Sequence, residues 1–152
     1  MASRKVKQTK QVKQTKLKWE QAEVDTRNWL RQHGIKSTRQ SFAAPIDLLT
    51  EAGLGIEVKF ASFRTLNKKK KQKGFTFNIH RHNRVDERDV DFYCLVLGPD
   101  REGFLRKTFT VLVLPAPLNR RTLSVTPRSL LLKFGGRLND WKSIADAEQA
   151  AA

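Results

Sequence analysis

Cysteine and long apolar runs are both scarce in this chain of 152 residues. Its one cysteine, Cys94, cannot form a disulfide within the chain, which excludes a disulfide-stapled scaffold and indicates a reducing, intracellular compartment. No apolar run approaches the roughly 18 residues that a membrane-spanning helix needs, and the start of the chain lacks the apolar segment of a secretory signal. We therefore expect a cytoplasmic protein that does not act at a membrane.

Acidic residues are outnumbered by basic ones. The chain has 15 Asp and Glu against 30 Lys and Arg, which gives a formal net charge of +15. A basic excess of this size favours a polyanionic partner, most often nucleic acid. Residues 1–18 carry no acid at all and predict a flexible tail, either a solubilising segment or an arm that contacts phosphates.

Histidine is too rare for a strong metal signal. His80 and His82 would share one face of an extended strand, but only His33 and Cys94 could complete a zinc site, and a closed zinc site usually needs four ligands. Contact with phosphates or bases is the preferred interpretation of this segment, and partly buried structural histidines are the alternative. The residues concerned are His80, Arg81, His82 and Arg84.

Apolar periodicity and turn signals predict one domain over residues 19–145, between the basic tail of residues 1–18 and a frayed segment of residues 146–152. A helix over residues 19–33 is expected to end at Gly34, because glycine suits the position after a helix. The later elements expected are a strand over 35–42, a hairpin over 45–60, strands over 75–79, 92–97 and 108–114, a helix from Thr126 and Pro127 to Gly135, and a last helix through Trp141, Ile144 and Ala145.

The hairpin is the most informative stretch. Apolar and other residues alternate strictly over 54–60, which is the period of a half-buried strand. Residues 51–53 end in glycine and predict a tight turn. A turn centred on Ala52 places Leu48 opposite Ile56 and fixes the partners of every other residue in the pair.

This register brings charged side chains together. Asp47 falls opposite Glu57, and Lys59 falls diagonal to Asp47, on the face away from the apolar residues. Directly opposed residues have Cβ atoms roughly 4.5–5.5 Å apart, so the two carboxylates repel each other. A divalent cation between them would remove the conflict, because hard cations prefer carboxylate oxygens.

A basic segment follows the hairpin. Residues 64–73 contain a run of four lysines that cannot pack in a core, so we expect an exposed loop. The run can serve solubility alone or contact phosphates, and the charge of the whole chain favours the second interpretation. The candidate DNA-binding residues here are Arg64, Lys68, Lys69, Lys70, Lys71 and Lys73.

An acidic helix, then Pro45-x-Asp47, then Glu57-x-Lys59 resembles the PD-(D/E)XK nuclease superfamily over roughly residues 19–114. This sequence departs from the usual pattern, since one residue separates its proline from its aspartate. The resemblance implies an α/β (α+β) fold of the restriction-endonuclease type. In that fold a mixed central sheet is flanked by helices, and the core runs from a helix through a catalytic hairpin to further strands and C-terminal helices.

The resemblance also implies a site. Asp47, Glu57 and the Val58 carbonyl would hold Mg²⁺, with Mn²⁺ as a substitute and no small-molecule cofactor. Lys59 would orient or help to deprotonate the attacking water and stabilise charge on the phosphate. Glu23 would be the helix acid near the metal, with Glu20 as the other choice.

Within the superfamily, residues 75–83 and 91–97 look most like a homing endonuclease of bacterial group I introns. That resemblance implies site-specific cleavage of double-stranded DNA at the nucleoid, and at least a dimer, because each chain has one site. A restriction enzyme and a Holliday-junction resolvase are alternatives of the same fold. A non-catalytic, basic nucleic-acid-binding protein is the alternative of a different class.

Overall fold

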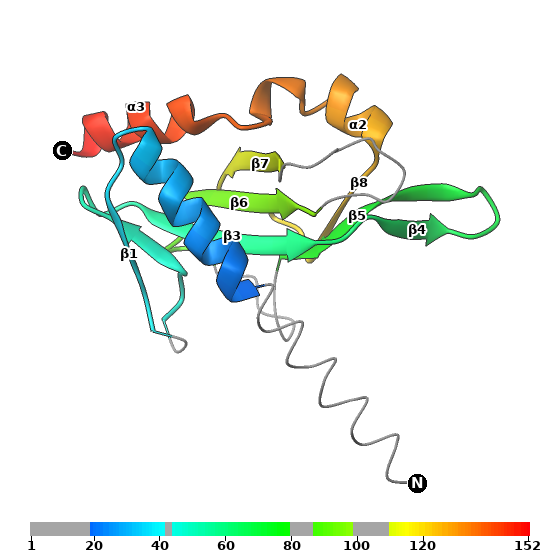
Figure 1. Cartoon of the computed structure of the whole chain (residues 1–152), viewed down its shortest axis with the longest axis horizontal. Coiled ribbons are helices and arrows are strands. Elements are labelled where there is room, and N and C mark those ends of the chain that lie inside the picture. The colour runs from blue at the N-terminus through cyan, green and yellow to red at the C-terminus, as the bar shows by residue number, and fades with distance from the viewer. Residues whose placement is uncertain (1–18, 42–43, 80–86, 99–109) are drawn as a thin grey trace, which may run out of the picture.

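A five-stranded mixed sheet forms the centre of the computed structural model, which describes residues 19–41, 44–79, 87–98 and 110–152 (Figure 1). The strands lie in the order β1-β2-β3-β6-β7. All neighbours are antiparallel except β3 and β6, which are parallel. The strand bounds are β1 Ser37–Arg39, β2 Leu48–Thr50, β3 Gly55–Ala61, β6 Phe92–Leu97 and β7 Thr110–Pro115.

A second, antiparallel sheet has the order β4-β5-β8. Its strands are β4 Arg64–Asn67, β5 Gln72–Asn78 and β8 Thr122–Val125. The β4–β5 ribbon extends past the central sheet at one end of the molecule (Figure 1). The helices are the N-terminal helix, described over residues 19–32, then α2 Pro127–Leu132, the short 3-10 helix η1 Gly135–Arg137, and α3 Trp141–Ala151.

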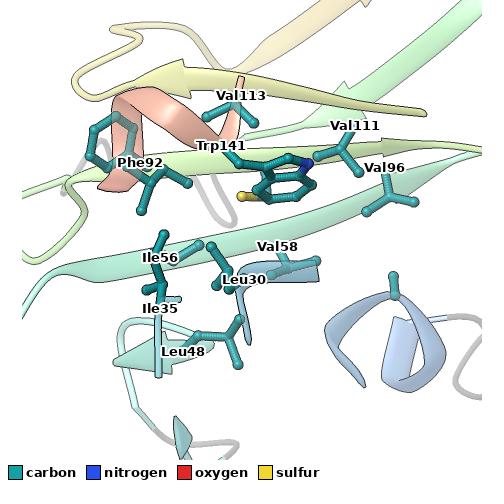
Figure 2. Packing of buried hydrophobic residues seen from close by; sticks show 13 residues of the cluster. Leu30, Ile35, Leu48, Ile56, Val58, Phe92, Val96, Val111, Val113 and Trp141 are labelled. Carbon is teal, nitrogen blue, oxygen red and sulfur yellow. The ribbon is translucent and has the colours of Figure 1, made fainter. Parts of the chain in front are cut away.

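Strand β6 of the central sheet is buried on both faces, as its continuous apolar run predicts. Alternate residues of β6 enter two cores: Cys94 packs in the first and Leu95 in the second. The first core lies beneath the N-terminal helix and α3, where Leu30 and Trp141 pack against the sheet (Figure 2). The second core lies between the central sheet, the second sheet and α2, and Phe75 is fully buried there.

The N-terminal helix ends where its sequence predicts. Gly34 has φ +78°, and its N–H donates to the Arg31 carbonyl, while the Ile35 N–H reaches back to the Leu30 carbonyl at 2.9 Å. These two bonds form a Schellman motif, and Leu30 and Ile35 are both buried in the first core. The helix is thereby fixed across the sheet, which sets where its acidic residues lie.

Several elements differ from the sequence-based expectation. Residues 64–67 form a strand, so the expected loop is reduced to the turn at residues 68–71. Strand β8 was not expected, and the strand expected over 35–42 is limited to Ser37–Arg39. Helix α3 continues to Ala151, through the segment that was expected to fray, because Glu148 bonds to the Thr50 hydroxyl and the Ala52 N–H.

The α+β class, with a mixed central sheet and flanking helices, agrees with the expected fold. The tail of residues 1–18 lies outside the described residues. Among the helices that are described, none has both the length and the apolar character needed to cross a membrane.

Candidate active site

The β2–β3 hairpin has the predicted register. Leu48 pairs with Ile56, and Leu49 pairs with Gly55. Gly53, in the turn, has φ +95°, a value that glycine adopts at no steric cost. The local pattern was therefore sufficient to determine how these two strands align.

Asp47 lies just before β2, so the expected pair of Asp47 with Glu57 falls outside the ladder. Its backbone is nevertheless held on both sides: the Asp47 N–H donates to the Ile56 carbonyl at 3.1 Å, and the Gln40 N–H donates to the Asp47 carbonyl at 2.9 Å. The carboxylate continues the ladder, because Asp47 Oδ2 accepts the Val58 N–H at 2.7 Å. This bond fixes the side chain at the edge of β3, where β2 stops.

The Val58 carbonyl faces the same edge. The N–H and C=O of one strand residue point to the same side, and the Val58 N–H points to Asp47. Glu57 and Lys59 alternate with the buried residues of β3, and their side chains meet with Nζ 3.1 Å from Oε1. Both are largely shielded, with 17% of the Glu57 side chain and 20% of the Lys59 side chain exposed.

Glu23 reaches this group from the N-terminal helix. It lies close enough to Asp47 for the two side chains to share a hydrogen bond. Its Oε2 also accepts two hydrogen bonds from Arg39, at 3.2 Å from Nε and 2.9 Å from Nη2. Glu20, the other candidate for the helix acid, is exposed to solvent.

The carboxyl groups are electrostatically coupled. Burial and the charge of Glu57 raise the pKa of Asp47 from 3.8 to about 6, although the Val58 N–H and Lys59 oppose the rise. Burial, with Asp47 nearby, also raises the pKa of Glu23, against the effect of Arg39. Both carboxyls thus resist ionisation, as expected for acids crowded without enough positive charge.

The residues present suit a hard divalent cation. Asp47 and Glu57 supply carboxylate oxygens, and the Val58 carbonyl faces the same edge. Burial and the charge of Glu57 raise the pKa of Asp47, and a bound cation would oppose both effects. In the described part of the chain, no three or more acidic, histidine or cysteine side chains form a metal-binding group. A cation here would therefore use two carboxylates and a backbone oxygen, with water completing its shell.

The candidate DNA-binding residues fall into two sets. Arg64, Lys73 and the lysines of the turn at 68–71 are exposed on the β4–β5 ribbon. His80, Arg81, His82 and Arg84 lie outside the described residues.

Sequence reasoning missed Arg39. The one signal in the sequence is that Arg39 lies on a strand directly after the acidic helix. Its contact with Glu23 depends on how that helix crosses the sheet, which the sequence does not reveal.

Comparison with known proteins gives a match at the level of structure. No protein-family model and no curated protein sequence matches the chain. The fold is similar to the solved structure of a bacterial homing endonuclease, I-Ssp6803I, with a TM-score of 0.60 and 18% sequence identity, over 90% of this chain and 96% of that chain. At this identity the similarity establishes that the chain has the fold of that nuclease.

Proposed function

We propose that this protein is a metal-dependent DNA endonuclease of the PD-(D/E)XK type, which cleaves both strands of a specific duplex site as a homing endonuclease does. The observation that carries the proposal is the meeting of Asp47, Glu57 and Lys59 at the edge of β3. The basic charge of the chain and a fold shared with a homing endonuclease support it. A purely structural role does not explain why Asp47 is partly buried beside the charge of Glu57, where burial and that charge raise the pKa of Asp47.

Asp47, Glu57 and the Val58 carbonyl are the residues proposed to hold Mg²⁺, or Mn²⁺ in its place. When bound there, such an ion would polarise the phosphoryl oxygen and lower the pKa of water. The protein's own part is to position these groups, which it does by fixing Asp47 to the Val58 N–H.

Lys59 is proposed to act on the attacking water and the phosphate. Its ammonium is held 3.1 Å from Glu57, so it has a fixed place beside a carboxylate ligand. Lysine has three N–H donors, which allows it to keep this contact and donate to a water or phosphate oxygen as well. Glu23 lies near Asp47 and would add negative charge beside the bound metal ion.

The proposal is tested by incubating the full chain with DNA and Mg²⁺. The substrates are a plasmid of mixed sequence, DNA that carries a candidate insertion site, and a four-way junction, which separate the homing, restriction and junction-resolving alternatives. We expect cleavage of duplex DNA in Mg²⁺ or Mn²⁺ and none in EDTA.

Two variants sharpen this test. Asp47→Asn and Lys59→Met should each lower the cleavage rate by at least about 100-fold and leave DNA binding in Ca²⁺ within a few-fold of wild type. If the wild-type chain binds all these substrates and cuts none, the protein is a non-catalytic nucleic-acid-binding protein. If both variants lose binding instead, these residues are structural.

A further inference from the structure

Arg39 lies beside the candidate active site but has no place in the chemistry proposed above. It lies on β1, the edge strand of the central sheet, and pairs there with Leu48 of β2. Leu48 is the residue after Asp47, so Arg39 lies close to Asp47 in the sheet. Cross-strand partners share a face, and Leu48 faces the first core, beneath the N-terminal helix. Arg39 therefore points to the side of the sheet from which Glu23 approaches Asp47.

The contact between Arg39 and Glu23 leaves part of the Arg39 side chain accessible. Arginine has five N–H donors. The hydrogen bonds that it makes with described residues use Nε and Nη2, both on the same Glu23 oxygen. Of the two side chains, that of Arg39 is 40% exposed and that of Glu23 only 23%. Glu23 is thus the more buried partner and lies near Asp47, and Arg39 is the more exposed one.

The charges of the site also favour a cation at this point. Glu23, Asp47 and Glu57 are three acids, and Lys59 and Arg39 are two bases, so the fully ionised group is negative by one charge. One divalent cation and one phosphodiester bring the total to zero. Without Arg39 the three acids, Lys59 and one divalent cation sum to zero, so the site would have no net charge with which to attract the phosphate.

We propose that Arg39 binds a DNA phosphate at the edge of the active site and that Glu23 is the positioning residue that holds its guanidinium there. Arginine is suited to this role because its planar fork donates to a phosphate while another edge bonds a carboxylate. Glu23 then acts through Arg39 on the substrate. The inference rests on the proposed function, because it needs DNA as the substrate.

Binding, measured apart from cleavage, tests the inference. The full chain is titrated with a short, fluorescein-labelled duplex of mixed sequence in Ca²⁺ over a range of salt concentrations, and anisotropy gives Kd and its salt dependence. Arg39→Met should weaken binding about tenfold at low salt and reduce the slope of log K against log salt by about one unit, as expected when one phosphate is no longer neutralised. Arg39→Lys should restore the slope, because it keeps the charge.

The double variant Glu23→Gln with Arg39→Met separates the two roles of Glu23. If Glu23 acts through Arg39, the double variant should bind DNA no more weakly than Arg39→Met alone. Additive losses of affinity, or an unchanged slope in Arg39→Met, would overturn the inference. Thermal unfolding of each variant identifies any that fails to fold, and Arg39→Lys then carries the test.

Arg27 provides the matched control. Its Nε donates to the Ser37 carbonyl at 3.0 Å, so it also connects the N-terminal helix to β1 but does not reach the carboxylates. Arg27→Met should leave the salt slope as in the wild type; an equal decrease of slope in both variants would make Arg39 a structural tie and overturn the inference. Wild-type cleavage in Mg²⁺, recorded in parallel, shows separately whether the proposed function itself holds.

Discussion

Asp47 is the residue on which the charges of the candidate site converge. Its Oδ2 accepts the Val58 N–H, and its pKa responds to the nearby side chains of Glu57, Lys59 and Glu23. Without a bound cation this arrangement costs stability, because burial and the charge of Glu57 make the Asp47 carboxyl harder to ionise than an ordinary aspartate. The folded protein is therefore less stable at neutral pH than it would be with an uncharged residue at this position.

Asp47→Asn should reveal that cost. The pKa of Asp47 is about 6 in the folded chain and 3.8 as its ordinary value, so the folded state binds the proton more tightly. The free energy of unfolding then falls as pH rises between about 4 and 6, and it stays low above that window. We expect Asp47→Asn, in EDTA at neutral pH, to raise the free energy of unfolding by on the order of 1–3 kcal/mol.

Chemical denaturation at several pH values measures this effect. Asn keeps an oxygen that can accept the Val58 N–H, so the hydrogen bond is retained. The control is Asp146→Asn, an exposed acid on α3, which should change the free energy of unfolding by less than about 0.5 kcal/mol. A wild-type stability that is flat across the window would contradict the assignment.

The sequence allowed part of this site to be placed. Asp47, Glu57 and Lys59 belong to one hairpin, so local alternation and the turn decide their spacing. The contact of Glu23 with Arg39 joins residues 16 positions apart on different elements, and no local pattern encodes it.

The β2–β3 and β4–β5 hairpins differ in how they are placed, because the first lies within the central sheet and the second extends from it. Strand β3, which carries Glu57 and Lys59, lies between β2 and β6 and has most of its residues shielded. The β4–β5 ribbon extends from the body and ends in the four lysines at 68–71 (Figure 1). A two-stranded ribbon fits the major groove of DNA. The lysines in the turn of this ribbon could then bind the phosphates that border the groove.

Replacement of the four lysines at 68–71 by glutamine should weaken DNA binding and flatten its salt dependence. Each phosphate that the protein no longer neutralises lowers the slope by about 0.9 units, so four such phosphates would lower it by roughly three to four units. Cleavage at saturating protein should persist, because the ribbon tip is not part of the carboxylate group. Salt-dependent anisotropy and single-turnover cleavage test the two statements separately.

Lys142→Gln on α3 is the control for charge alone, since Lys142 is 86% exposed and pairs only loosely with Asp146, at 3.9 Å. A slope that is equal in the quadruple variant and in this control would mark the turn as a solubilising segment.

Strands β4 and β8 were not predicted because they lack a long alternation of apolar and polar residues. Strand β4 is almost wholly exposed, so it has no apolar face to reveal it. Strand β8 has alternating burial but only four residues, between a proline-rich segment and the cap of α2. Strand β6 was predictable because it is apolar throughout, as a strand covered on both faces must be.

Each whole molecule presents one candidate site among its described residues, whereas a duplex has two strands of opposite direction. Concerted cleavage of both strands therefore needs two chains related by a two-fold axis. We expect sedimentation to show at least a dimer on duplex DNA, and a supercoiled plasmid to become linear without accumulation of a nicked circle. A monomer that first nicks the plasmid would contradict this expectation.

The hydrogen bonds between Glu148 of α3 and the β2–β3 turn can form only late in the synthesis of the chain. Glu148 holds Thr50 from 98 positions further along, so a ribosome that adds roughly 5–20 residues per second takes about 5–20 s to supply it. The acids and the lysine-rich ribbon are all synthesised before this bond can form. A nascent chain can therefore attract polyanions for several seconds before its hairpin turn is locked in place.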